Sequence, residues 1–417
     1  MLERKLSGWQ ATLLVVGAMV GSGILATPAL VAASSSSATM VMLFWLGGGF
    51  YAMMGALSQA ELAARYPEAG GDYVFLREAF GKLTAFLSGW VSLTVGFAGA
   101  IAGLALTCAD YLARAGLPLE GYGGFVASLI IVALTAVNLL GVEKGSATQA
   151  ILTVGKVVGL LVLAVVAWFG AGPARPMAAP SAPIWAALLP VIFTYSGWND
   201  SIYLGSEIVR PRRNLPLSLI AGTAGVTLLY LLFNFAYLRV TAGSAGSGDL
   251  AAAASMAERT LGGQASLAVS VLAALMLLGT IAALVVSGPR IAWAMAQDRA
   301  LPPWFGKVSR RGVPAPSLYL QAGIALAFVQ IGTVEQIFSW VGFAIVVFSG
   351  LATACVFVER ARGYVPKGYR IPLYPLPPLI YVAGSLAIAA TVLYSNPWDT
   401  AWGVGFIVAG LPIYWLS

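Results

Sequence analysis

The runs Gly21-Ser22-Gly23-Ile24 and Tyr195-Ser196-Gly197-Trp198-Asn199 each lie in the middle of a long apolar segment. Each run carries glycine, which lets a helix unwind, at the depth where the segment would cross a bilayer. Unwound backbone at that depth is tolerated only where it is buried in protein or lines a cavity. Broken helices at matching positions in two halves of a chain mark the binding site of many secondary transporters. We therefore expect the functional site between these two runs.

The composition is that of a polytopic membrane protein. Of the 417 residues, 59% are hydrophobic and only 9% are charged, and the mean hydropathy is +0.86. A soluble domain carries about 25% charged residues. The 2 cysteines, Cys108 and Cys355, lie in apolar runs, and the chain has 0 histidines. We therefore expect no disulfide framework, no metal site, no cofactor and no catalytic triad, so that the protein is not an enzyme.

Apolar stretches of about 20 residues predict membrane spans. They lie near 8–33, 38–64, 83–112, 122–141, 147–170, 183–208, 215–240, 265–290, 315–332, 336–358, 375–394 and 399–416, which makes twelve. With the N-terminus in the cytoplasm, 18 of the 23 Lys and Arg residues fall on the inner side and 4 on the outer side. This asymmetry predicts a multi-pass protein of the cell membrane with both termini in the cytoplasm. Membrane topology thus accounts for the net charge of +7, and no nucleic-acid partner is expected.

The two glycine-broken spans are the first and the sixth, so the repeating unit is five helices. Because five is odd, the second unit begins on the opposite side of the membrane, and the repeat is inverted. We expect one transporter domain over 1–417, with repeats at about 8–170 and 183–358 and two further spans at about 375–416. The inner loop after the second span also carries a helix-like stretch, Asp72–Phe80.

A break in a helix exposes backbone amides at the start of the downstream half and carbonyls at the end of the upstream half. The amides, at the positive end of the half-helix dipole, suit a carboxylate, and the carbonyls suit an ammonium group. Two facing breaks therefore suit an α-amino acid without any charged side chain. The alternative is that Gly21 and Gly23 let neighbouring helices pack closely.

Aromatic and acidic side chains surround the second break. Phe193, Tyr195 and Trp198 flank it, and Asn199 and Asp200 follow. An aromatic ring at this place acts either as a lid on the cavity or as ordinary packing. An acid within a span is a functional candidate, and Asp200 either takes part directly, faces the inner vestibule or pairs with a basic loop residue.

Lys156 is the basic residue placed deepest in a predicted span. Burying an ammonium group costs several kcal/mol unless carbonyls or a carboxylate receive it. Such a lysine can replace a bound sodium ion or titrate as part of proton coupling. The alternative is that its long side chain reaches the cytoplasmic interface.

Several runs resemble the amino acid–polyamine–organocation (APC) superfamily over nearly the whole chain. In chain order they are Gly21-Ser22-Gly23-Ile24 with Pro28; Glu61-Leu62 through Tyr66-Pro67-Glu68-Ala69-Gly70-Gly71-Asp72-Tyr73; Arg77-Glu78-Ala79-Phe80-Gly81; Phe193 through Asn199; Glu207 with Asn214-Leu215-Pro216; Arg290; Ala294-Met295-Ala296-Gln297-Asp298; and Leu301-Pro302-Pro303. Within the superfamily the chain looks most like the L-amino-acid transporter (LAT) branch and its bacterial relatives, through Tyr195-Ser196-Gly197-Trp198-Asn199 and Lys156.

The resemblance implies an all-α, LeuT-type fold of twelve transmembrane helices, with spans 1 and 6 unwound and the amino acid held between them. It implies that the backbone of Ser22, Gly23 and Ile24 takes the carboxylate and that the carbonyls of Met19, Phe193 and Ser196 take the amine. Phe193 is then the lid, Lys156 fills the space of a sodium site, and Asn199 shapes the unwound part of span 6. The complete substrate-binding set is Met19, Gly21, Ser22, Gly23, Ile24, Phe193, Tyr195, Ser196, Gly197 and Asn199.

Two positions depart from the LAT pattern. Eukaryotic members carry a cysteine in the outer loop after span 3 that bonds a single-span partner, and the loop at 113–121 has none. We therefore expect no disulfide-linked heavy chain. Ser196 replaces a residue that is often glycine in LAT proteins, which narrows the pocket beside the substrate side chain.

The predicted function is sodium-independent transport of neutral L-amino acids across the lipid bilayer, by exchange, facilitated diffusion or proton symport. An antiporter of basic amino acids or polyamines is the alternative within the same class, supported by Asp200, Tyr195 and Trp198. An intramembrane enzyme would need a catalytic constellation, and a channel would need a filter or a charged ring; neither pattern is found in the sequence.

Overall fold

The computed structural model describes residues 2–118, 121–170, 180, 183, 187–241, 265–331, 334–366, 368–395 and 397–416. Three of the basic residues used to predict the orientation, Arg175, Arg259 and Lys367, lie outside these ranges, as do two residues of the loop at 113–121.

The first half of the chain runs from the N-terminus to the first part of the second break. Its elements are α1 (Gly8–Met19), α2 (Gly23–Ala33), α3 (Ala38–Arg65), α4 (Asp72–Phe80), α5 (Lys82–Val91), the π-helix η1 (Ser92–Gly99), α6 (Ala100–Arg114), α7 (Gly123–Leu139), α8 (Val142–Gly170) and α9 (Leu188–Thr194). Helix α4 confirms the helix expected in the inner loop. The wide turn at η1, inside the third predicted span, was not expected from the sequence.

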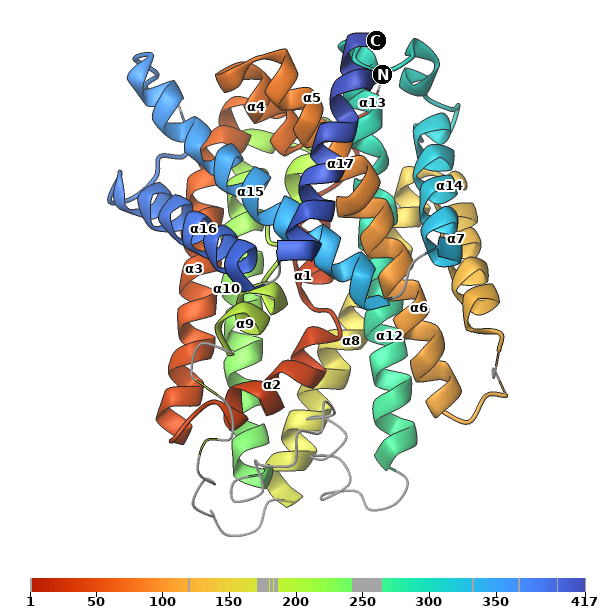
Figure 1. Cartoon of the computed structure of the whole chain (residues 1–417), viewed down its shortest axis with the longest axis vertical. Helices are drawn as coiled ribbons and strands as arrows, with labels where there is room; N and C mark the ends of the chain where they lie inside the picture. The colour runs from red at the N-terminus through yellow and green to blue at the C-terminus, as the bar shows by residue number, and fades with distance from the viewer. Residues whose placement is uncertain are drawn as a thin grey trace.

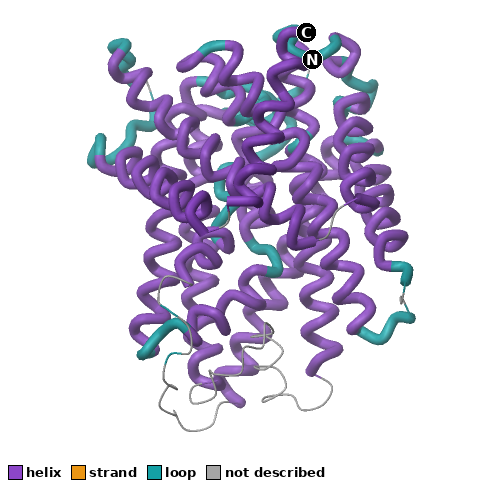
Figure 2. Tube along the Cα trace, in the orientation of Figure 1, coloured by secondary structure: helices purple, strands orange, loops and turns teal. Residues whose placement is uncertain are grey.

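The second half begins with a short 3₁₀ turn. Its elements are η3 (Asp200–Tyr203), α10 (Pro211–Thr241), α12 (Ala265–Ser287), α13 (Pro289–Gln297), the 3₁₀ turn η5 (Pro303–Gly306), α14 (Ala315–Ile331), α15 (Val334–Ala361), α16 (Leu376–Ser395) and α17 (Pro397–Leu416). Within the described ranges the chain has no strand, only two isolated bridges, Leu6 with Ile208 and Ala69 with Leu204. Figure 2 shows this helical character along the described part of the trace.

Six described helices are long and apolar enough to cross a membrane, and a seventh crossing is the bent pair of α1 and α2. Three shorter apolar segments, Gly123–Leu139, Ala315–Ile331 and Thr400–Trp415, add to them. The protein is thus a helical, multi-pass membrane protein. Figure 1 shows the two ends of the chain at the same end of the molecule, together with α4 and α13, as expected for an even number of crossings.

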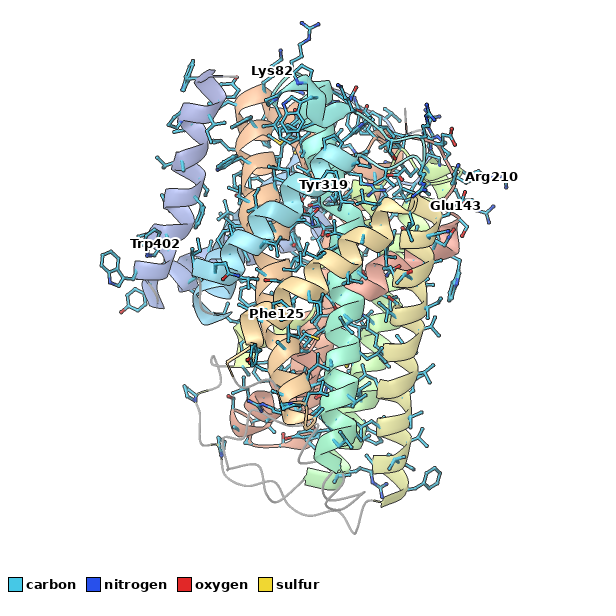
Figure 3. All side chains as sticks on the ribbon, turned by 90° about the vertical axis from the view of Figure 1, so that its right-hand side faces the viewer. Lys82, Phe125, Glu143, Arg210, Tyr319 and Trp402 are labelled. Carbon is cyan, nitrogen blue, oxygen red and sulfur yellow. The ribbon has the colours of Figure 1, made fainter. Side chains whose placement is uncertain are left out.

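The surface divides into a charged end and apolar flanks. Figure 3 shows Lys82, Glu143 and Arg210 in the half of the molecule that holds both chain ends, whereas Trp402 projects from one side and Phe125 lies on the face turned to the viewer. Phe125 and Trp402 are 69% and 59% exposed. Apolar side chains exposed in such number belong to a surface that faces lipid.

The two broken segments lie at the centre of the bundle, between the long helices. Helix α1 packs against α8, α10 and α12, and α2 packs against α9. The pairs α3 with α10 and α8 with α12 build the walls around them. Helix α15 crosses the bundle to contact α3, α6 and α16 (Figure 1). This arrangement brings both breaks to one place.

Candidate functional site

The first break separates α1 from α2. Helix α1 ends at Met19, α2 begins at Gly23, and the two axes differ by 50°. The linker turns tightly, because the Gly21 amide donates to the Met19 carbonyl at 2.9 Å and the Leu25 amide donates to the Ser22 carbonyl at 2.9 Å. The amides of Gly23 and Ile24 lie in the first turn of α2, where helix geometry provides no acceptor four residues earlier. They are therefore available to an anionic group.

The second break follows α9, which ends at Thr194. The Ser196 amide donates to the Phe193 carbonyl at 3.0 Å, and Gly197 has a φ of 90°, a backbone conformation that favours glycine. The chain then passes through Asn199 into the short turn η3. The sequence expectation of an unwound segment at Tyr195–Asn199 agrees with this geometry.

The two breaks touch each other directly. A Cβ atom on Gly197 would lie 3.0 Å from the carbonyl carbon of Ala18, at the end of α1. A Cβ atom on Gly23 would lie 3.0 Å from Oγ1 of Thr194, at the end of α9. The hydroxyls of Thr27 and Thr194 are 2.9 Å apart and join α2 to α9. Glycine is therefore needed at these two crossings because backbone or side-chain atoms of the other break occupy the space.

A cavity of about 640 Å³ lies between the breaks. Nine of the residues predicted from sequence line it: Met19, Gly21, Ser22, Gly23, Phe193, Tyr195, Ser196, Gly197 and Asn199. Two do not. Ile24 is fully buried and offers only its backbone, and Lys156 lies behind the first break. A cavity of this size holds a small polar molecule together with water.

Two of the three carbonyls expected to receive the amine already accept hydrogen bonds. The Met19 carbonyl accepts from the Tyr230 hydroxyl at 2.9 Å as well as from the Gly21 amide. The Phe193 carbonyl accepts from the amide and from the hydroxyl of Ser196, the latter at 2.7 Å. A carbonyl has two lone pairs, so the Met19 and Phe193 carbonyls have no free lone pair in this conformation.

The aromatic side chains of the second break have different environments. Phe193 is 39% exposed, and its ring lies against Gly342 of α15. Tyr195 is 1% exposed and donates to the Trp45 carbonyl at 2.9 Å. Trp198 is 4% exposed and packs edge-on against Tyr381. Of these three rings, Phe193 alone is therefore free to move over the cavity, whereas the other two hold the second break against α3 and α16.

Lys156 joins α8 to the first broken helix. Its side chain is fully buried, and its ammonium group donates to the Gly17 carbonyl at 2.5 Å and to the Thr280 hydroxyl at 3.1 Å. Thr280 also lies 3.2 Å from the Val20 carbonyl, within the break. A Cβ atom on Gly279 would meet the lysine stem at 3.3 Å, so glycine there leaves room for it. The lysine therefore does not extend to the surface of the protein.

Sequence reasoning missed several residues of the cavity. Polar side chains of α2, α9, α12, α15 and α16 line it: Thr27, Thr194, Thr280, Ser349, Tyr381 and Ser385. Asp72, at the start of α4, also lines it and was missed, whereas Asp200, which also lines it, was a candidate from the sequence. The run Gly70-Gly71-Asp72 was a visible signal, because two glycines before a helix indicate a close approach of the backbone to another element.

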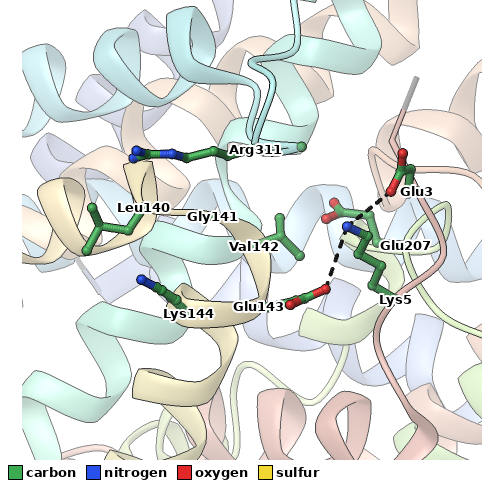
Figure 4. Close-up of a pocket in the computed structure, with 10 residues that line it drawn as sticks. Glu3, Lys5, Leu140, Gly141, Val142, Glu143, Lys144, Glu207 and Arg311 are labelled. Carbon is green, nitrogen blue, oxygen red and sulfur yellow. Dashed lines mark ion pairs between the residues drawn. The ribbon is translucent and has the colours of Figure 1, made fainter.

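A smaller pocket lies near the N-terminus (Figure 4). There Lys5 forms ion pairs with Glu3 at 3.1 Å and Glu143 at 3.6 Å. The hydrogen bond to Glu3, and then the charges of Glu3 and Glu143, raise the pKa of Lys5. The amides of Lys5 and Leu6 also donate to the Glu207 carbonyl. The N-terminal segment is thus fixed to the chain that follows η3.

Fold and site together are those of a membrane transporter with a substrate cavity between two broken helices, and the comparisons with known proteins give the same class. The family model "Amino acid permease" matches residues 6–416. The chain belongs to this family of amino acid transporters, which are not enzymes, within the APC superfamily that the sequence resembles.

Curated relatives cover the chain over its whole length. The "Serine/threonine exchanger SteT" of Bacillus subtilis (strain 168) is 29% identical over 434 residues, covering 99% of this chain and 97% of that protein. The mouse "b(0,+)-type amino acid transporter 1" is 26% identical, covering 100% and 88%. The human "Large neutral amino acids transporter small subunit 2" is 27% identical, covering 100% and 81%.

Proposed function

We propose that this protein exchanges neutral L-amino acids across the cell membrane by alternating access, without sodium. The observation that carries the proposal is the pair of contacting breaks, which present the amides of α2 and the carbonyls that end α1 and α9 to one cavity. We also propose the LeuT-type arrangement of twelve spans as two inverted five-helix repeats, with cytoplasmic termini. The similarity to a serine/threonine exchanger supports exchange as the mode.

The carboxylate of the substrate binds the amides of Ser22, Gly23 and Ile24. These amides point out of the first turn of α2, and the half-helix dipole adds a favourable contribution of about 0.3–1 kcal/mol. Gly21 and Gly23 keep the approach free of side chains, and Ser22 adds a hydroxyl.

The ammonium group binds the carbonyls of Met19, Phe193 and Ser196. The Ser196 hydroxyl fills one lone pair of the Phe193 carbonyl, and the Tyr230 hydroxyl fills one of the Met19 carbonyl, so both hydroxyls must rotate away when the amine arrives. The Ser196 hydroxyl is then free to contact the substrate side chain. A small or hydroxylated side chain suits this place, because the serine occupies space that glycine would leave open.

Phe193 acts as the lid. It is the exposed aromatic ring at the cavity, and its contact with Gly342 places it between the second break and α15. Rotation of the ring about its side-chain bonds covers the substrate without a change in the backbone. Tyr195 and Trp198, which are buried, keep the second break in position during this step.

Lys156 takes the place of a sodium ion. Its ammonium group binds the Gly17 carbonyl and, through Thr280, the linker of the first break. A sodium ion about 4 Å from it would be repelled by roughly 4 kcal/mol at an effective dielectric constant of 20. That energy lowers the affinity of the site for sodium by about a thousandfold, so the ammonium group and a sodium ion do not occupy the site together.

The alternative, an antiporter of basic amino acids or polyamines, has weaker support. Asp200 was its main candidate, but Ser287 donates to its carboxylate at 2.7 Å, so one of its oxygens already has a protein partner. We also propose that the protein acts without a disulfide-linked heavy chain, because Cys108 and Cys355 are both buried inside helices.

Counterflow in proteoliposomes tests the proposal. Vesicles loaded with one neutral amino acid should accumulate labelled neutral amino acids from outside at equal rates in sodium and choline buffers. Lysine, arginine and putrescine should not be accumulated. Strict dependence on sodium, or uptake of the basic compounds alone, would contradict the proposed function.

A further inference from the structure

A buried carboxyl group, Asp72, forms the inner end of the cavity. Helix α4 lies between the predicted spans that contain α3 and α5, and Asp72 is its first residue. The side chain is 5% exposed. One oxygen, Oδ2, accepts from the Asn199 amide at 3.2 Å and, more weakly, from the Tyr203 hydroxyl at 3.4 Å. Asp72 therefore joins α4 to the unwound segment that follows α9.

The other carboxyl oxygen, Oδ1, is buried and has no hydrogen-bond partner within the described ranges. The Gln59 side chain lies beside the carboxyl group, where its amide favours the ionised form, and the same amide donates to Thr353 at 3.3 Å. An unpartnered, charged acceptor is costly in a protein interior. One proton on Oδ1 removes this buried charge.

No positive charge is paired with this carboxylate among the described residues. The polar and titratable groups that face it come from each neighbouring element: Gln59 of α3, Asn199 and Tyr203 of the unwound segment, Cys355 of α15 and Tyr381 of α16. The remaining carboxyl group of the cavity, Asp200, has its own partners. Burial of the ionised form is therefore compensated only by neutral groups.

Burial raises the pKa of Asp72 to about 7, although the hydrogen bonds from Tyr203, Asn199 and Gln59 lower it. The position at the start of α4 also favours the ionised form, but burial outweighs it. With a pKa near 7, the carboxyl group is about 90% protonated at pH 6 and about 10% protonated at pH 8.

The backbone just before Asp72 is bonded to the segment that follows the second break. The Gly70 amide donates to the Tyr203 carbonyl at 3.1 Å, and the Ala69 amide donates to Ser206 at 2.8 Å. A Cβ atom on Gly71 would lie 2.4 Å from the Tyr203 ring. Any motion of the unwound segment that opens the inner end of the cavity therefore changes the environment of Asp72 and exposes it to water.

We propose that Asp72 is a proton-binding site that couples the inner opening of the cavity to cytoplasmic pH. The protonated form carries no charge and lets α4 stay packed against α3 and the unwound segment in the conformation described here. Loss of the proton leaves a buried charge in that conformation and favours the opened, hydrated one. This proposal rests on the proposed transport function for its kinetic consequence, but the proton site itself does not depend on it.

Infrared difference spectra of the purified protein between pH 6 and pH 8 test the proton site directly. Asp200 is a second buried carboxyl group of the cavity, so the spectra are recorded in an Asp200→Asn background. This background should show the C=O stretch of one buried carboxylic acid that disappears as the pH rises. The band should be absent when Asp72→Asn is added and retained when Asp298→Asn is added. Asp298 is the matched control because it pairs with Arg77 at 2.8 Å at the same inner end. An Asp200→Asn background without such a band, or a band that survives the addition of Asp72→Asn, overturns the proposal.

Exchange assays test the coupling. In oriented proteoliposomes, raising the pH of the cytoplasmic side from 6 to 8 should change the exchange rate of the wild type up to about tenfold, the change in protonated fraction. Asp72→Asn should be insensitive to pH, whereas Lys156→Ala and Asp298→Asn should keep the pH dependence. A dependence abolished in Lys156→Ala and kept in Asp72→Asn assigns the proton to the lysine and overturns the proposal.

A second variant covers the case in which Asp72→Asn does not fold. Asn199→Leu removes a donor to the ionised carboxylate, so it should shift the infrared transition and the pH profile to higher pH. An unchanged transition would overturn the assignment. If Asp72→Asn alters which amino acids compete but leaves the pH profile intact, the carboxylate binds substrate and the proton proposal fails. If the protein transports no amino acid but the infrared band is present, the proposed function is contradicted and the proton site is not.

Discussion

Replacing Gly197 with alanine should damage both the stability and the transport activity of the protein. Gly197 has a φ of 90°, and a Cβ atom there would lie 3.0 Å from the Ala18 carbonyl carbon and 3.1 Å from its oxygen. The neighbours that it meets include backbone atoms, which cannot rotate away as a flexible side chain does. Left-handed backbone costs an L-residue about 1–2 kcal/mol, before the close contact is counted.

An energy of this size changes the population of the required conformer by about 5- to 30-fold. We expect Gly197→Ala to lower the apparent melting temperature in detergent, and to reduce counterflow of neutral amino acids by about 5-fold or more, because the conformer that brings the two breaks together becomes rare. The assays are thermal denaturation followed by size-exclusion chromatography, and counterflow normalised to the amount of folded protein.

Gly225→Ala is the matched control. Gly225 lies in α10 in an ordinary helical conformation, and a Cβ atom there would meet nothing within 4 Å. Alanine at this position should therefore leave both measurements unchanged or slightly raise the stability. If Gly197→Ala melts and transports as the wild type does, the close contact between the two breaks has no role in the site, and the reasoning is refuted.

Three further substitutions test the parts of the site. Gly23→Val should abolish uptake of a folded protein, because the side chain meets Thr194 and blocks the amides of α2; normal uptake would place the carboxylate elsewhere. Phe193→Ala should slow exchange about 10-fold or more while equilibrium binding, measured by scintillation proximity, falls less; unchanged kinetics would argue against a lid. Lys156→Ala should slow exchange by releasing α8 from α1, whereas the exposed control Lys144→Ala should not; full activity together with sodium dependence of the wild type would refute the account of the lysine.

The broken helices were predictable because their signal is local. Gly21, Gly23 and Gly197 interrupt apolar runs that are long enough to span a bilayer, and few other structures satisfy such a pattern. Nine of the predicted residues line one cavity for this reason. The depth of Lys156 in its segment likewise predicted burial, and its contact with α1 follows from the need of a buried ammonium group for oxygen partners.

The parts that were not predictable depend on contacts between distant segments. Asp72 lines the cavity because the loop before α4 pairs with the chain around Tyr203 and Leu204, more than a hundred residues later. The occupied carbonyls of Met19 and Phe193 depend on where Tyr230 and Ser196 place their hydroxyls. No periodicity or motif in either segment encodes such partners, because they are fixed by packing and not by local sequence.

The central claim is that the two breaks recognise the α-amino and α-carboxyl groups of one amino acid. Equilibrium binding of three matched ligands to the purified protein tests it most directly: a neutral L-amino acid that the protein exchanges, the amine that lacks its carboxylate, and the acid that lacks its amino group. The account predicts binding of the amino acid alone, with both analogues weaker by about 100-fold or more, the effect of about 3 kcal/mol, and loss of amino acid binding in Gly23→Val. Binding of the amine or the acid with an affinity equal to that of the amino acid would contradict it.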